Sequence, residues 1–144
     1  MNYNNFVEAK RKLSSFAKRN GVVVSWVFTD ECANYHQRKT KKQPARVVIR
    51  AKQSRSKKIC VFLHELGHVM DYQKRPHCHK FYQTGYSAEF WGGKAVPQYQ
   101  KKIILLAETR AWDEAARLAK KLGIRVGKRF QFWKRKSLAS FENR

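Results

Sequence analysis

The segment that decides the fold spans residues 57–74 and reads KKICVFLHELGHVMDYQK. We expect it to form one largely apolar helix. Ser54 or Ser56 can cap the start of this helix, because serine side chains accept hydrogen bonds from the first free backbone amides. The helix should end before Pro76, since the residue preceding a proline is disfavoured in helical conformation. This helix carries the chemistry that the rest of the chain must position.

His64 and His68 lie four residues apart, so their imidazoles project from one face of the helix about one turn apart. Two imidazoles in this geometry can bind one metal ion. Glu65 lies beside them and can act on a water at the metal without being a ligand, which is the HExxH arrangement of zinc hydrolases. Gly67 leaves room for a neighbouring segment to approach. The alternative is that both histidines and Glu65 are ordinary surface residues of the helix.

A catalytic zinc ion usually takes a third protein ligand. One known arrangement places a third histidine six residues after His68, but that position is Lys74. Asp71 lies only three residues after His68, and three ligands from one short stretch of helix are geometrically awkward. We therefore expect Asp71 to orient an imidazole or the incoming chain.

Glu108 is the strongest candidate for the third ligand. At about 100° per residue it falls inside an apolar stripe on the helix predicted over residues 98–122, whereas Asp113 points away and Glu114 lies toward the edge. The stripe consists of Ile104, Ala111, Ala115, Leu118 and Leu122. A carboxylate in such a stripe is costly unless it binds a metal or is paired. Zinc would explain Glu108, and a salt bridge to Lys or Arg is the alternative.

The run HELGHVMDY at residues 64–72, followed by ETRAW at residues 108–112, resembles the gluzincin peptidases. It is most similar to the small ImmA/IrrE-type peptidases and their phage relatives, over about residues 4–122. The resemblance implies one zinc ion per chain, bound by His64, His68 and Glu108, with Glu65 as general base and acid. The substrate would be a protein. The Asp after the motif is also similar to that of lethal-factor-like peptidases.

A second resemblance is to SprT-like peptidases, which combine HExxH with DNA binding. They carry a further histidine shortly after the motif, and His77 or His79 could take that part. A tetrahedral oxyanion also needs a donor. Tyr82, Tyr86, Tyr99 and His77 are candidates, and ordinary packing is the alternative for each tyrosine.

The remaining pattern predicts an α+β fold, which the resemblance makes a small zincin-like domain. The expected order is helix, strand, strand, HExxH helix, loop region, Glu-bearing helix and basic tail, over residues 4–19, 22–29, 45–51, 57–74, 75–99, 98–122 and 124–144. Residues 30–44 should form a loop or a wide hairpin turn. Residues 1–123 would form the peptidase domain, and residues 124–144 would pack on it or extend from it.

Thirty-two Lys and Arg against ten Asp and Glu give a net charge of +22, which indicates contact with nucleic acid or another polyanion. A merely solvated surface is the alternative. The expected nucleic-acid contacts are Lys41, Lys42, Arg55, Lys57, Lys58, Arg125, Lys128, Arg129, Trp133, Lys134, Arg135 and Lys136. Two further functions stay open: a nucleic-acid-binding protein on a peptidase scaffold with weak or no proteolysis, and a basic effector that binds an acidic protein.

Cys32, Cys60 and Cys78 are odd in number and irregularly spaced, which argues against a disulfide framework. Without an apolar leader or a long apolar run, we expect a cytoplasmic protein without membrane contact, which the phage-type resemblance would place in an infected bacterial host. Cys32 and His36 could form a second, structural zinc site with residues 77–79, or all of these could be loop residues.

Overall fold

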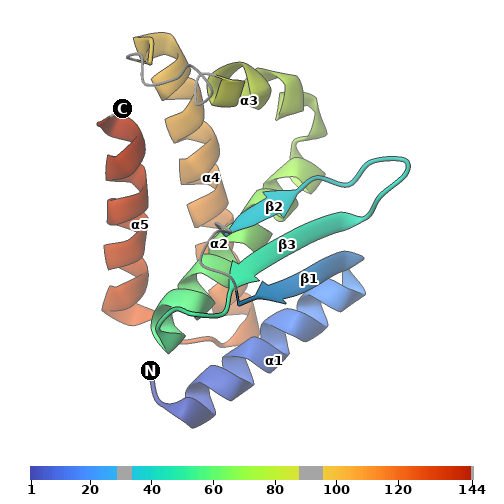
Figure 1. Ribbon diagram of the computed structural model, residues 1–144, viewed down its shortest axis with the longest axis vertical. Coiled ribbons are helices and arrows are strands. Elements are labelled where there is room, and N and C mark those ends of the chain that lie inside the picture. Colours follow the sequence, from blue (N-terminus) through green and yellow to red (C-terminus); the bar gives the residue numbers. More distant parts are fainter. Residues whose placement is uncertain (29–33, 88–95, 144) are drawn as a thin grey trace.

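The computed structural model describes residues 1–28, 34–87 and 96–143, which form an α+β domain of helices around a small sheet (Figure 1). The elements are α1 (Tyr3–Arg19), β1 (Val22–Val27), β2 (Tyr35–Gln37), β3 (Ala45–Arg50), α2 (Arg55–Lys74), the 3₁₀ helix η1 (Pro76–Cys78), α3 (His79–Tyr86), α4 (Gln98–Leu122) and α5 (Gly127–Glu142). None of the helices in these ranges combines the length and apolar character needed to cross a membrane.

The sheet has the strand order β1-β3-β2, with β1 parallel and β2 antiparallel to β3. The two predicted strands are therefore parallel neighbours, in register from Val22 opposite Ala45. The expectation of a loop or wide hairpin turn over residues 30–44 is wrong in part. Residues 35–37 of this segment form β2, which makes the hairpin with β3 and lies at the edge of the sheet. Residues 29–33 lie outside the described part of the chain.

The HExxH helix α2 occupies the centre of the fold, against α1, the sheet, α4 and α5. Its first turn is capped by Ser54, whose Oγ accepts a hydrogen bond from the backbone N–H of Lys57 at 3.3 Å. The helix ends at Lys74, just before Pro76, as predicted. Phe62, Leu63 and Leu66 are fully buried beside the sheet and α1, so the core fixes the rotation of α2.

The segment predicted as a loop over residues 75–99 is largely helical where it is described. Residues 76–86 form η1 and α3, and α3 packs on α4 through buried Tyr82 and Gly85. Residues 88–95 lie outside the described ranges. Helix α4 then follows Pro97 and ends at Gly123, whose φ of 67° is the left-handed conformation that glycine adopts without strain.

The basic tail folds back onto the domain. Residues 127–142 form α5, which packs on α4 and α2 (Figure 1). Ile124 and Phe130 belong to the hydrophobic core, and Trp133 and Leu138 pack against it. Of the two alternatives for this tail, packing on the domain is the one observed.

Gly67 lets α2 and α4 approach closely, as its small size suggested. A Cβ atom on Gly67 would lie 2.1 Å from the backbone oxygen of Ala111 and 3.2 Å from the backbone nitrogen of Ala115. Neither atom can move without moving α4. Gly67 lies between the two HExxH histidines, so this contact also sets the distance from α2 to the Glu108 side of α4.

We expect Gly67→Ala to lower the free energy of unfolding by about 3 kcal/mol, because the overpacking penalty exceeds alanine's helix-propensity gain of about 1 kcal/mol. Gly85→Ala is the matched control. Its Cβ would lie 2.7 Å from Cγ2 and 2.9 Å from Cβ of Ile103, which is a milder overlap than the one at Gly67. A loss of about 1 kcal/mol is expected there. Urea unfolding of both variants measures the difference, and equal losses would contradict the close-approach argument.

Candidate metal centre

Three side chains from two helices meet in the core. His64 and His68 come from the middle of α2 and Glu108 from α4. The Nε2 atoms of the two histidines lie 3.2 Å apart. Glu108 Oε2 lies 2.9 Å from His64 Nε2 and 3.1 Å from His68 Nε2. Three ligand-type atoms thus form a nearly equilateral triangle.

This triangle fits a zinc ion closely. Ligand atoms about 2.1 Å from a tetrahedral ion lie about 3.4 Å from one another. The observed separations are a few tenths of an ångström shorter, so a small outward movement of the side chains would match that geometry. An ion on one side of such a triangle keeps its fourth position open, as in catalytic zinc sites. His64, His68 and Glu108 are all buried.

The partners of Glu108 exclude a salt bridge to Lys or Arg within the described ranges. Its contacts there are His64, His68 and Tyr86, whose hydroxyl donates to Oε1 at 3.0 Å. Glu114, which was expected toward the edge of the helix, provides the contrast. It is 1% exposed, and its carboxylate pairs with Lys74 at 2.9 Å and Arg117 at 2.7 Å. Asp113 does face away from the core, toward Lys134 of α5.

The electrostatics of the triangle favour an anionic Glu108. Burial by itself would raise the pKa of this carboxyl, but the neighbouring His68 and His64 outweigh burial and hold the pKa well below its usual range. A carboxylate that stays charged in the core needs positive charge beside it. Protonated imidazoles can supply this charge, and so can a metal cation shared by all three residues.

Aromatic stacking holds the imidazoles in place. His64 stacks on Trp112 at a centroid distance of 4.2 Å, and Trp112 meets Phe130 of α5 edge-on at 5.2 Å. On the other side, His68 stacks on His36 at 4.1 Å. His64 Nδ1 is buried and has no hydrogen-bond partner among the described side chains and backbone, so ring stacking takes the place of the acceptor that zinc-bound histidines usually have.

The sequence interpretation missed a chain of hydrogen bonds at Glu65. His36 Nδ1 lies 2.9 Å from Glu65 Oε2, and His36 Nε2 lies 3.3 Å from the hydroxyl of Tyr72. Burial, with the charges of Glu108 and Asp71, raises the pKa of Tyr72 to about 12, so its hydroxyl is a donor at neutral pH. One tautomer satisfies the chain: Tyr72 donates to Nε2, and Nδ1–H donates to Glu65.

The pKa of His36 agrees with the neutral ring that this chain requires. Burial, followed by the charge of His68, lowers the pKa of His36 below its ordinary value, so a neutral ring is favoured. Burial would raise the pKa of Glu65, but the hydrogen bond from His36 and the neighbouring His64 and His68 outweigh it and lower the pKa. Glu65 is therefore a carboxylate with one oxygen, Oε2, held by His36.

A second set of metal-ligand atoms overlaps the first. It consists of His36, Glu65 and His68. Its Glu65 and His36 already satisfy each other by a hydrogen bond, and His36 is less buried than the members of the first set. The set of His64, His68 and Glu108 is the better metal site on these grounds.

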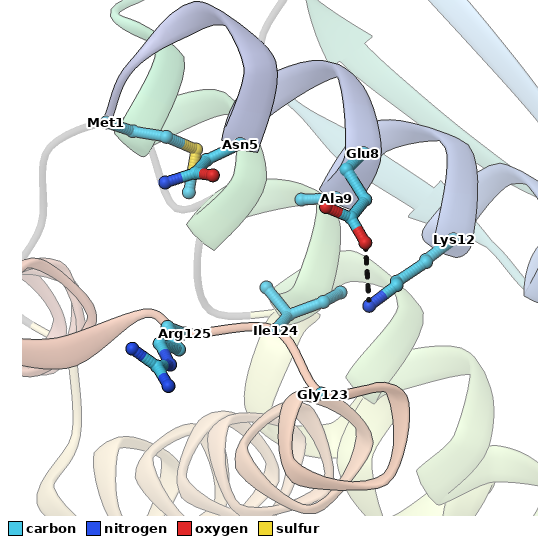
Figure 2. A pocket seen from close by; sticks show the side chains of 8 residues that line it. All are labelled: Met1, Asn5, Glu8, Ala9, Lys12, Gly123, Ile124 and Arg125. Atoms are coloured by element: carbon cyan, nitrogen blue, oxygen red, sulfur yellow. Dashed lines mark ion pairs between the residues drawn. The ribbon is translucent and has the colours of Figure 1, made fainter.

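A cleft of about 380 Å³ gives access to this centre. Its walls include His64, Glu65 and Glu108 from the centre, and Lys57 and Trp133 from the start of α2 and from α5. Figure 2 shows a different pocket, of about 250 Å³, between α1 and the turn after α4. Its acidic lining residue, Glu8, is already paired with Lys12 at 3.4 Å, so it adds no metal ligand.

The expectation that Asp71 orients an imidazole is not met by its contacts. Asp71 is 1% exposed and pairs with Arg75 one turn later, and it also bonds to Tyr82. Among the described residues it contacts neither His64 nor His68. Its carboxylate instead ties the end of α2 to α3.

The expected oxyanion donors separate into two groups. Tyr86 lies at the candidate metal centre, where its hydroxyl donates a hydrogen bond to Glu108. Tyr82 is buried and accepts a hydrogen bond from Arg110 at 2.8 Å, so it packs α3 on α4 and does not line the cleft. His77 and Tyr99 are exposed and also lie outside the lining of the cleft.

The suggested second zinc site is not assembled. Within the described ranges, no ligand group forms around residues 77–79, and Cys32 lies outside those ranges. His36 belongs to the main centre. Cys60 is buried, which raises the pKa of its thiol to about 12 and makes it a core residue.

The expected nucleic-acid contacts do not form one surface. Lys41 and Lys42 are exposed in the β2–β3 connection, which lies on the opposite side of Figure 1 from α5. Arg55, Lys57 and Lys58 lie at the start of α2. Arg125 lines the pocket of Figure 2, while Lys128, Arg129, Trp133, Lys134, Arg135 and Lys136 lie on α5. The start of α2 and α5 do meet, through Lys57 and Trp133.

Comparisons of this chain with protein-family models, with curated proteins and with solved structures find no match.

Proposed function

We propose that this chain is a zinc-dependent endopeptidase with a zincin-like fold, in which His64, His68 and Glu108 hold the metal ion. The observation that carries the proposal is the position of Glu108. A buried carboxylate from a second helix lies within 3.1 Å of both HExxH imidazoles and has no Lys or Arg partner in the described part of the chain. A surface role for these three residues would not bury them together.

The residues of the cleft divide the reaction between them. A zinc ion held by the three ligands would polarise the peptide carbonyl and acidify a water molecule. Glu65 lines the cleft and takes the proton of the attacking water, then delivers it to the leaving amine. His36 fixes the carboxylate by binding Oε2 and leaves Oε1 without a hydrogen bond from the described residues. Tyr86 orients Glu108 through Oε1.

A second function, nucleic-acid binding on this scaffold, is supported by the charge. Part of the net charge of +22 lies on α5, where Lys128, Arg129 and Arg135 are exposed. A peptidase held on nucleic acid in the cytoplasm would use this surface to reach a protein partner. Binding through such a surface weakens steeply as the salt concentration rises.

Metal content tests the proposed function first. We expect about one zinc ion per chain in wild-type protein reconstituted with zinc and freed of excess metal, measured by elemental analysis. His64→Ala should lose the ion. His77→Ala is the matched control, because His77 is exposed and outside the cluster, and it should keep the ion. Wild type that holds no zinc, or equal zinc in both variants, would contradict the proposed metal site.

A further inference from the structure

Two lysines share one tryptophan ring in the wall of the catalytic cleft. Lys57 Nζ lies 4.5 Å from the centroid of the Trp133 ring, and Lys136 Nζ lies 5.2 Å from the same centroid. Lys57 comes from the first turn of α2, whereas Trp133 and Lys136 come from α5. All three line the cleft that also contains His64, Glu65 and Glu108.

The two ammonium groups bring like charges together in one wall of the cleft. Among residues 1–28, 34–87 and 96–143, neither lysine has an ion-pair partner. Burial, with the charges of Lys136 and Arg50, lowers the pKa of Lys57, so its surroundings disfavour the charged form of this side chain. The Trp133 ring offsets part of this repulsion, since an aromatic face attracts cations. This arrangement therefore favours the binding of an anion.

The two carboxylates among the described residues that line the cleft do not supply that anion. Glu65 is bound by His36, and Glu108 lies between His64 and His68. With a zinc ion bound, the two carboxylates are balanced by the ion, and the lysine charges remain.

We propose that Lys57 and Lys136 form a subsite of this cleft that binds the acidic side chain of a peptide substrate near the bond to be cleaved. This inference rests on the proposed peptidase function and names its substrate class. An amphipathic wall with two donors suits an Asp or Glu side chain, because charge-assisted hydrogen bonds from ammonium to carboxylate are the strong ones.

Nucleic acid fits the same wall less well. Base stacking needs an open aromatic face, but the Trp133 ring already carries two ammonium groups, and Phe132 meets it edge-on at a centroid distance of 4.9 Å. The cleft of about 380 Å³ accommodates side chains and also holds the candidate metal ligands. Lys128, Arg129 and Arg135 are exposed on α5 and do not line this cleft.

The test uses two peptides that differ at one position. An alanine-rich peptide that the protein cleaves is prepared in two forms. One form has a single Glu next to the scissile bond, and the other has Gln at the same position. We expect wild-type, zinc-loaded protein to cleave the Glu peptide with about tenfold higher kcat/KM. Anisotropy with labelled peptides and zinc-loaded Glu65→Gln protein should show the same preference in Kd without cleavage.

The charge variants then locate the preference. Replacing Lys57 and Lys136 together by Gln should abolish the preference, so that kcat/KM for the Glu peptide falls to the value that the same variant shows for the Gln peptide. Lys10→Gln is the matched control, because Lys10 lies 4.3 Å over the Trp26 ring but does not line the cleft. It should keep the full preference.

Three outcomes would overturn the inference. The first is that wild-type protein cleaves both peptides with the same kcat/KM. The second is that Lys10→Gln loses the preference for Glu as fully as the double variant does. The third is that a single-stranded oligonucleotide displaces the Glu peptide, binds more tightly than it and needs Lys57 and Lys136 for this binding. Each leaves cleavage itself measurable, so the peptidase function could still stand. If the zinc-loaded protein cleaves no peptide in a mixed library, that result would instead contradict the proposed peptidase function.

Discussion

Glu65→Gln is expected to keep the zinc ion and to lower the rate of peptide cleavage by about 10²–10⁴-fold, the range typical of a lost general acid–base. The amide oxygen of Gln can still accept the hydrogen bond from His36 Nδ1, so the 2.9 Å contact and the packing around it should persist. What the variant loses is the ability to take a proton from water. Elemental analysis and steady-state kinetics on the same preparation measure both properties.

The control for this variant is Asp113→Asn. It makes the same change in net charge on a half-exposed carboxylate outside the centre, and it should leave both zinc and rate unchanged. The zinc result also separates the two possible ligand sets. If Glu65→Gln loses the ion, the site is the one formed by His36, Glu65 and His68, and our choice of ligands is wrong. If it keeps the wild-type rate, Glu65 is not the base.

The helix that carries the motif and the helix that carries Glu108 were both predictable, because their signals are local. Ser54, Pro76, Pro97 and Gly123 mark the ends of long periodic segments, and α2 and α4 run between them. The meeting of Glu108 with both histidines follows from the position of Glu108 in an apolar stripe. A charged residue on a buried face requires a partner.

The strand β2, and with it His36, could not be predicted in this way. A segment of three residues, Tyr35–Gln37, is too short for an alternating pattern to stand out, and its pairing with β3 depends on contacts distant in sequence. His36 reaches Glu65 only because the chain passes from β1 to the far side of β3. The parallel pairing of β1 with β3 is equally non-local.

Two other differences between the structure and the sequence expectations are caused by long basic side chains. Glu114 was placed near the edge of its helix, yet it is buried, because Lys74 and Arg117 cover it while their own ends stay exposed. Helix α5 was hidden by its charge. Val126, Phe130, Trp133 and Leu138 contact the core at roughly helical spacing, but the basic residues between them suggested a tail.

Glu108→Gln is expected to weaken zinc binding more than about 100-fold, which exceeds the loss typical of a residue that only supports a ligand. The amide has nearly the shape of the carboxylate, so Tyr86 can still donate to its oxygen. However, the negative charge that holds the ion between His64 and His68 is gone. Competition with a fluorescent zinc chelator measures the affinity, and circular dichroism checks that the helices remain.

Glu114→Gln provides the opposite result on the same helix. Glu114 is buried like Glu108, but its closest partners are Lys74 and Arg117, which can both turn to solvent. We expect it to lose about 1–3 kcal/mol of stability and to keep its zinc ion. If Glu108→Gln also keeps full zinc occupancy, Glu108 is a structural carboxylate like Glu114, and the third ligand must be sought elsewhere. If only Glu108→Gln loses the ion, the two buried acids of α4 have distinct roles: one is balanced by surface cations, and the other by the metal.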